Sequence, residues 1–208
     1  MTAPKPSDLA FIRFVSVENM MRLVNGIGVE TVLRDLARYI EDDFRRWTLF
    51  DKTPRVASHS AEGVIELMPT SDGVSYGFKY VNGHPKNTKS GLQTVTAFGL
   101  LPRVDTGYPE LLTEMTLLTA LRTAATSAMV ARHLAPKGAT TMAMIGNGAQ
   151  SEFQALAMRA ICGISELRLY DIDPAATEKL MRNLSGLGIG LTACKTAQEA
   201  TLGAQIIT

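Results

Sequence analysis

A pair of glycines near residue 146 is the feature of this sequence with the clearest chemical meaning. Residues 140–151 form a short apolar run, a turn through Gly146 and Gly148, and the expected start of a helix. Gly146 permits the tight turn and Gly148 lets the backbone come close to phosphate oxygens. The helix start directs free N–H groups and its positive dipole end towards an anion, so the segment predicts a binding site for a dinucleotide pyrophosphate.

The turn gains weight from an acidic residue further along the chain. Ser151 stands where the dinucleotide fingerprint has its third glycine, but a second expected strand ends in Asp171, about 20 residues on, where that fingerprint has its ribose anchor. A carboxylate there accepts hydrogen bonds from ribose hydroxyls and repels a 2′-phosphate, which favours NAD over NADP. Asp173 is a rival for this role, although Asp173-Pro174 is more typical of a helix cap. A strand–turn–helix that binds no nucleotide stays open as the alternative.

Three charged residues outside this turn have surroundings that suit substrate binding. Lys79 lies in a strand-like run between two aromatic residues and should point to the opposite face from them. Arg122 shares one face of an otherwise small and apolar helix with three threonines, and its planar guanidinium suits a carboxylate. Glu66 is flanked by apolar strand residues and faces either an edge or a pocket. The alternative for Lys79 and Arg122 is an ordinary solvated side chain.

The elements that must position these residues fall into two parts. The first part has two helices over 16–46, broken near Gly26–Gly28, then β-prone runs at 56–58, 64–68, 76–80, 93–101 and 110–115 separated by turn signals that include Asn82-Gly83. These runs predict an antiparallel sheet. A long helix over 116–134, with Thr116 as its N-cap, follows the sheet and leads to the glycine turn.

The second part alternates strands with helices. The expected strands are 140–145, 166–171, 190–194 and 204–208, and the helices between them are 149–162, 174–185 and 196–202. Such alternation predicts a parallel sheet with right-handed crossovers. The fold class is therefore α/β, with an α+β domain over 1–136 and a Rossmann domain over 137–208 that holds four of the usual six or so strands.

Composition limits the class of protein. The chain has 208 residues, a net charge of +1 and 46% hydrophobic residues, which suits one or two globular domains. Charges of both signs are interspersed, so nucleic acid is not an expected partner, and no apolar run reaches the ~18 residues of a membrane span. The first residues lack the apolar core of a signal peptide. Cys162 and Cys194 lie in apolar segments and are not spaced as metal ligands, so we expect reduced thiols, no metal site and a cytoplasmic location.

Several longer motifs together resemble the ornithine cyclodeaminase/μ-crystallin family. They are Lys79-Tyr80-Val81-Asn82-Gly83-His84-Pro85-Lys86-Asn87, Gly91-Leu92-Gln93-Thr94-Val95, the helix 117–127 with Arg122-Thr123-Ala124-Ala125, and Gly146-Asn147-Gly148-Ala149-Gln150-Ser151. The resemblance extends over nearly the whole chain from about residue 10. The Lys79 loop and the Arg122 helix are specific to the family, whereas many families share the glycine turn.

The resemblance implies a substrate-binding and dimerisation domain followed by an NAD-binding domain. The implied reaction converts L-ornithine into L-proline and ammonia: hydride leaves Cα for NAD⁺, the δ-amine attacks the resulting imine, ammonia departs and the cyclic imine takes the hydride back. NAD is recycled, so the enzyme is a lyase. The implied partners are the amino acid and a second copy of the chain in a homodimer.

Site roles follow from the resemblance position by position. Arg55, Lys79 and Arg122 match groups that bind the substrate carboxylate, and Lys79 also matches a proton-transfer position. Glu66 matches an acidic position that meets the substrate amine. Cofactor contacts fall on Thr94 near the nicotinamide, on Asp171 at the ribose, and on the pyrophosphate turn of Gly146, Asn147, Gly148, Ala149 and Gln150.

The family pattern continues beyond Thr208. Its acidic residue that handles the substrate amines and its remaining Rossmann strands lie past that point, so we expect the chain to end within the nucleotide domain. Two other functions stay open. One is an imine reductase or amino-acid dehydrogenase on the same scaffold, and the other is a dimeric fragment that binds ligand without turnover.

Overall fold

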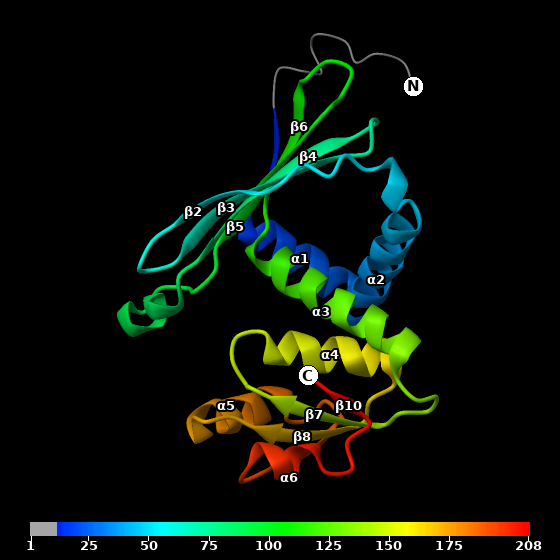
Figure 1. The fold of residues 1–208 in the computed structure, drawn as a ribbon, viewed down its shortest axis with the longest axis vertical. Coiled ribbons are helices and arrows are strands. Elements are labelled where there is room, and N and C mark those ends of the chain that lie inside the picture. The colour runs from blue at the N-terminus through cyan, green and yellow to red at the C-terminus, as the bar shows by residue number, and fades with distance from the viewer. Residues whose placement is uncertain (1–11) are drawn as a thin grey trace. The chain divides into compact units, whose positions relative to one another are not determined.

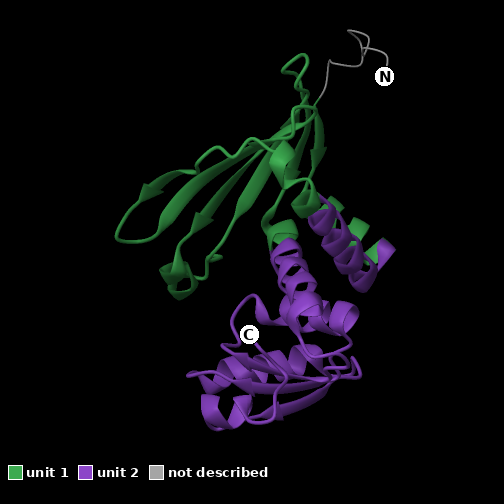
Figure 2. Cartoon of the chain, turned by 45° about the vertical axis from the view of Figure 1, so that its right-hand side comes forward, with its two compact units in different colours: residues 1–26, 43–119 green, residues 27–42, 120–208 purple. Residues whose placement is uncertain are grey.

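The computed structural model describes residues 12–208, and these divide into two compact units (Figure 2). Of the described residues, the first unit includes 12–26 and 43–119, and the second comprises 27–42 and 120–208. The expectation about a signal peptide concerns residues that lie outside the described part. The domain boundary expected at residue 136 follows the chain order, whereas the compact units place part of the N-terminal helices and most of the long helix with the parallel sheet.

The first unit is built on a six-stranded sheet in the order β1-β6-β5-β4-β3-β2 (Figure 1). Its strands are β1 (Arg13–Val15), β2 (Val56–His59), β3 (Val64–Ser71), β4 (Tyr76–Gly83), β5 (Ala97–Pro102) and β6 (Pro109–Glu114). Strands β2 to β6 pair antiparallel, as expected, while β1 pairs parallel with β6. Strand β1 was not predicted, because three residues are too few to show a period.

The two faces of this sheet differ in chemistry. Lys79 pairs with Met68 on β3 and Gly99 on β5, so its side chain lies on the opposite face from its neighbours Phe78 and Tyr80, as predicted. On that other face the rings of Tyr80 and Phe98 stack with centroids 5.0 Å apart. Lys79 and Glu66 therefore lie on one face, here called the charged face, and the stacked rings of Tyr80 and Phe98 lie on the other.

Two local expectations in this unit are wrong. Asn82-Gly83 does not form a turn but ends β4, and the turn-rich residues after it form the 3₁₀ helix η3 (Pro85–Ser90). Thr116 does not cap the long helix α3 (Thr116–Leu134). Glu114 Oε2 accepts the N–H groups of Thr116 at 2.8 Å and Leu117 at 3.1 Å, while Thr116 Oγ1 accepts from Ala97 N at 2.9 Å. Glu114 is the true cap because the threonine hydroxyl is already engaged with β5.

The second unit contains a parallel sheet in the order β10-β7-β8-β9, as the alternating pattern predicted. Its strands and the helices between them are β7 (Thr141–Ile145), α4 (Ser151–Cys162), β8 (Glu166–Tyr170), α5 (Pro174–Leu184), β9 (Gly190–Ala193), α6 (Ala197–Thr201) and β10 (Ile206–Ile207). Helix α4 packs beside α5, and α6 packs against β7 and β8 (Figure 1). The core is aliphatic, with Met142, Leu167, Leu169 and Leu180 almost fully buried.

The N-terminal helices are α1 (Val17–Ile27) and α2 (Val29–Arg45), and the short 3₁₀ helix η2 (Trp47–Leu49) follows them. Gly28, at φ 91°, separates α1 from α2, which confirms the predicted break. Within the second unit, Arg34 of α2 donates from Nε to the Ala160 carbonyl of α4 at 3.0 Å, and Glu41 pairs with Arg132 of α3. Along residues 12–208 no helix combines the length and apolar character that crossing a bilayer requires.

Candidate nucleotide and substrate sites

The glycine turn joins β7 directly to α4. Gly146 has φ 98°, in the left-handed region that favours glycine, and its N–H donates to the Tyr170 carbonyl of β8 at 2.8 Å. Gly148, Ala149 and Gln150 are exposed where the helix begins. A Cβ added to Gly148 would meet no protein atom within 4 Å. The turn therefore leaves open space at a helix N-terminus, which is the arrangement that receives a phosphate group.

Ser151 shows why a third glycine is not needed here. Its hydroxyl donates to the Gly148 carbonyl at 2.6 Å, and the residue is buried. The side chain therefore bonds back onto the turn that precedes α4. A serine at this position thus stabilises the turn through its own hydrogen bond.

Asp171 follows β8 and is fixed by two backbone N–H groups. Asn147 N donates to Oδ2 at 2.6 Å and Asp173 N donates to Oδ1 at 2.8 Å. These bonds, that from Asn147 first, lower the pKa of the Asp171 carboxyl below its ordinary value. The group is therefore a carboxylate at neutral pH, beside the turn, with lone pairs left to accept further hydroxyl donors.

Asp173 behaves as the predicted helix cap. Its Oδ1 accepts the Ala175 N–H at 3.0 Å at the start of α5, where Pro174 occupies the first helical position. The Asp173 carboxylate accepts a hydrogen bond from α5, while the Asp171 carboxylate accepts one from the glycine turn. The structure thus separates two acidic residues that the sequence left as rivals.

The residues of the second unit fit a dinucleotide. The open space over Gly148 accommodates a pyrophosphate, and the buried Oδ1 of Asn147 has no hydrogen-bond partner among the described residues. Ala149 and Gln150 lie exposed beside that space, as the pyrophosphate turn requires. NAD would be held there by the turn and by Asp171. It would supply a nicotinamide that takes and returns a hydride.

The charged face of the first unit brings together three of the predicted substrate residues. Arg55 immediately precedes β2, and its Nη1 lies 3.4 Å from Oε1 of Glu66 on β3. Glu66 pairs with Val81, two residues along β4 from Lys79, so Glu66 and Lys79 are diagonal neighbours on one face. Lys79 Nζ is 3.5 Å from Thr119 Oγ1 at the start of α3. An acid and two cations on one surface suit an amino acid, which carries both charges.

The loop that carries the Thr94 motif is attached to the end of β4. Asn82 is buried, and its Oδ1 accepts from both the N–H and the hydroxyl of Thr96, at 2.7 and 2.6 Å. The Thr94 carbonyl accepts from His84 N at 2.8 Å. Thr94 therefore has a defined place beside β4, while its predicted contact with the nicotinamide stays a prediction.

Arg122 lies on α3, one helical turn after Thr119, and its side chain is exposed. It belongs to the second unit, whereas Arg55, Glu66 and Lys79 belong to the first. Because α3 is a regular helix, Thr119 and Thr126 lie on the same face as Arg122. The Thr126 hydroxyl donates to the Arg122 carbonyl at 2.8 Å. The carboxylate-binding role of Arg122 stays a prediction.

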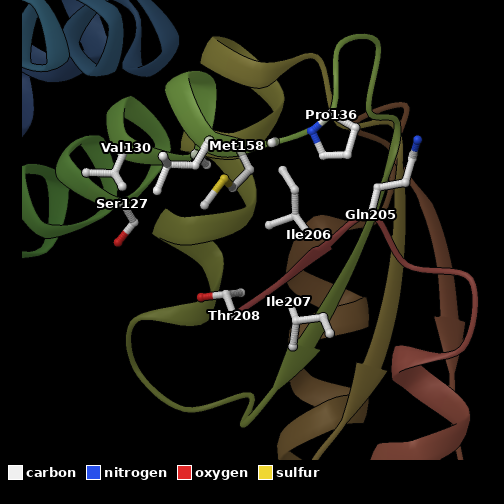
Figure 3. A pocket seen from close by; sticks show the side chains of 11 residues that line it. Ser127, Val130, Pro136, Met158, Gln205, Ile206, Ile207 and Thr208 are labelled. Carbon is white, nitrogen blue, oxygen red and sulfur yellow. The ribbon is translucent and has the colours of Figure 1, made fainter.

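A separate cleft of about 360 Å³ lies in the second unit between α3, α4 and β10 (Figure 3). Val130, Met158 and Ile206 give it a mostly apolar lining. None of the predicted site residues lines it. The cleft is therefore distinct from the glycine turn and offers no charged side chain to a substrate.

Three residues that organise these sites were not predicted from the sequence. Glu114 caps α3, Asn82 attaches the Thr94 segment to β4, and Thr177 of α5 accepts from Asn147 Nδ2 at 2.7 Å. A buried polar residue needs partners, so Asn82 and Asn147 carried a signal in their apolar surroundings. The identity of each partner depends on residues distant in sequence, which no local pattern shows.

Known proteins resemble this chain along its whole length. Ornithine cyclodeaminase of Brucella suis biovar 1 is 69% identical over 208 residues, which are 100% of this chain and 57% of that protein. The chain thus spans a little over half the length of this relative. A lysine cyclodeaminase structure, solved for the recognition of L-lysine, L-ornithine and L-2,4-diaminobutyric acid, superposes with a TM-score of 0.86 at 26% identity, covering 94% of this chain and 59% of that one.

An archaeal alanine dehydrogenase dimer with bound NAD superposes with a TM-score of 0.77 at 28% identity, covering 91% of this chain and 57% of that chain. These structures share the α/β architecture with its mostly antiparallel sheet and parallel four-stranded sheet. The family model for ornithine cyclodeaminase/mu-crystallin matches residues 17–208. That match includes the charged sheet face, the α3 helix and the glycine turn, and the chain belongs to the ornithine cyclodeaminase/mu-crystallin family.

Proposed function

We propose that this protein acts as an ornithine cyclodeaminase that converts L-ornithine into L-proline and ammonia with recycled NAD. The observation that carries the proposal is the 69% identity to the Brucella suis ornithine cyclodeaminase, which extends over all 208 residues. The match includes every residue singled out above for substrate or nucleotide binding. The chain covers 57% of that relative, so the activity of the whole protein is inferred from this shared part.

Charge complementarity supports the roles of the sheet residues. We assign the substrate carboxylate to Arg55, Lys79 and Arg122, because guanidinium and ammonium groups pair with carboxylates. Glu66 would meet an amine of the diamino acid. Lys79 would also move a proton at the substrate amine, as an ammonium placed at a reacting group does. Thr94 is assigned to the nicotinamide side of the cofactor.

NAD, and not NADP, is the proposed cofactor. The support is the Asp171 carboxylate, which two backbone N–H bonds hold in its charged form beside the turn. A fixed anion accepts hydrogen bonds from ribose hydroxyls and repels a 2′-phosphate. The relative with bound NAD shares the fold of this unit.

A homodimer is the proposed assembly. The face of the first unit opposite Lys79 exposes Val56, Ile65, Leu67 and Phe98, each at least 40% accessible. Contiguous apolar surface of this kind marks an interaction site in a soluble protein. The archaeal relative is a dimer.

The test is the conversion of L-ornithine by the purified protein with NAD⁺ far below the ornithine concentration. We expect equal amounts of proline and ammonia and no lasting absorbance change at 340 nm, because NAD is restored in every turnover. Ornithine consumption without proline would contradict the proposal. Binding of ornithine and NAD⁺ without ammonia release would instead indicate a ligand-binding module.

A second candidate is an amino-acid dehydrogenase or imine reductase on the same scaffold. The observation in its favour is the likeness to the archaeal alanine dehydrogenase, with a TM-score of 0.77 at 28% identity. This activity would produce or consume NADH stoichiometrically. A steady change in absorbance at 340 nm with one amino or imino acid would favour this second candidate.

A further inference from the structure

The glycine turn and the beginning of α5 are joined by a closed set of hydrogen bonds, here called the turn–α5 ring. Its members are Asn147, Asp171, Asp173 and Thr177. Asn147 N and Asp173 N hold the two oxygens of Asp171 at 2.6 and 2.8 Å. Asn147 Nδ2 donates to Thr177 Oγ1 at 2.7 Å. Because Asp173 also caps α5, which carries Thr177, the ring closes on itself.

Thr177 is the member of this ring that lies within α5. Asn147 and Thr177 are both buried, at 2% and 7% exposure. Within residues 12–208 the Thr177 hydroxyl is the only hydrogen-bond partner of the Asn147 side chain, since its Oδ1 has none. Loss of the hydroxyl would leave a buried amide without a partner, and the side chain would move to find one.

A movement of the Asn147 side chain would also shift its own backbone N–H group, which is bonded to Asp171. The backbone N–H of Asn147 supplies the shorter of the two bonds that hold the Asp171 carboxylate. A carboxylate held by one bond instead of two turns about its Cβ–Cγ axis more freely. Its charge then no longer occupies a fixed point beside the ribose.

We propose that Thr177 is a positioning residue for cofactor selection, acting through Asn147 to hold Asp171 where an unphosphorylated ribose donates to it and a 2′-phosphate is repelled. The inference rests on the nucleotide site of the proposed function. The ligand class is an adenosine diphosphate with free 2′- and 3′-hydroxyls. Thr177 itself needs no contact with the nucleotide.

The experiment measures calorimetric binding of ADP-ribose and of 2′-phospho-ADP-ribose to the full chain. We expect Thr177→Val, which keeps the shape and removes the hydroxyl, to weaken ADP-ribose binding about tenfold, the effect of one lost buried hydrogen bond. The ratio of the two affinities should fall about fivefold, because only Asp171 distinguishes the ligands. Thr177→Ser keeps the hydroxyl and should restore both values to near wild type.

Ile164→Val is the matched control. Ile164 is buried in the same unit, at 1% exposure, and has no part in the ring, so its loss of a methyl group lowers stability alone. It should leave the affinity ratio unchanged, which separates positioning from general destabilisation. If Thr177→Val does not fold, Thr177→Ala is measured instead, because its smaller side chain admits a water to the Asn147 amide without fixing it, and the ratio should still fall.

Three results would overturn the inference, and they differ in meaning. An unchanged ratio in the folded hydroxyl-free variant, with normal ADP-ribose binding by the wild type, would remove the positioning role and leave the nucleotide site intact. Absence of ADP-ribose binding by the wild type would overturn the nucleotide site of the proposed function together with this inference. If the ratio of the two affinities falls as much in Thr177→Ser as in Thr177→Val, the hydroxyl is not the group that positions Asp171.

Discussion

The two candidate sites hold their charged groups in different ways. In the second unit, Asp171 accepts two backbone bonds of 2.6 and 2.8 Å, and Asn147 donates to Thr177 at 2.7 Å. In the first unit, the contacts are side chain to side chain and longer, 3.4 Å between Arg55 and Glu66 and 3.5 Å between Lys79 and Thr119. In the candidate nucleotide site the Asp171 carboxylate is held by backbone N–H groups, whereas in the candidate substrate site Arg55 and Glu66 meet side chain to side chain.

This difference suits the binding of a cofactor at one candidate site and of a reacting substrate at the other. A cofactor that stays the same in every turnover is best met by groups that do not reorganise, because preorganisation lowers the cost of binding. A substrate that changes its charge and bonding needs groups that follow it, and catalytic hydrogen bonds are commonly long before a substrate arrives. Arg55 pairs with Glu66 at 3.4 Å and its side chain is 63% exposed, so its guanidinium can also reach a substrate carboxylate.

The largest effect should come from Lys79→Met. This variant keeps the length of the side chain and removes its charge and proton, so proline formation should fall by about 10²–10⁴-fold, the range for loss of a general acid or base. ADP-ribose binding, measured by calorimetry, should be unchanged because Lys79 belongs to the other unit. A parallel loss of nucleotide affinity would show that the two sites are not separate.

Arg122→Ala should have the next largest effect. Loss of a charge-paired contact weakens ornithine binding by about 2–4 kcal/mol, seen as a raised KM for ornithine. Arg122→Lys is the control, since it keeps the charge but not the planar fork, and should recover only part of the affinity. If NAD affinity falls while the KM for ornithine stays, Arg122 belongs to the cofactor site.

The two glycines of the turn offer a matched pair. In Gly148→Ala the new Cβ meets no protein atom, so thermal stability should stay near wild type while ADP-ribose affinity falls about tenfold or more through steric exclusion of phosphate. Gly146→Ala should lower the free energy of unfolding by about 1–2 kcal/mol, because its φ of 98° is strained for alanine. Unaltered ligand binding by Gly148→Ala would place the phosphate elsewhere.

The smallest effect concerns pH. Folding lowers the Asp171 pKa, so its contribution to stability is present above the unfolded pKa of about 3.9 and is lost as pH falls through the folded pKa. The free energy of unfolding of the wild type should therefore decrease more steeply below about pH 4 than that of Asp171→Asn, measured by urea denaturation. Equal slopes would mean that the two N–H bonds do not favour the charged carboxylate.

Much of the fold was predictable because its signals are local. The alternation of strands and helices after residue 140, the break at Gly28 and the bounds of α3 are each encoded in a short window of the chain. Where prediction failed, a tertiary partner had intervened. Thr116 had the right residue type for a cap, but its hydroxyl bonds to Ala97 and Glu114 takes the role.

The sequence by itself determined the glycine turn, the acidic residue after the next strand and the motifs shared with the family, because glycine spacing, strand ends and residue types are properties of neighbouring positions. Only the tertiary structure decided which side chains meet. Strand register sets Glu66 and Lys79 on one face, an ion pair joins Arg55 to Glu66, and the packing of α5 brings Thr177 to Asn147 across 30 positions of chain. Hydrogen bonds between distant residues depend on how elements pack, and the packing exists only after the chain has folded.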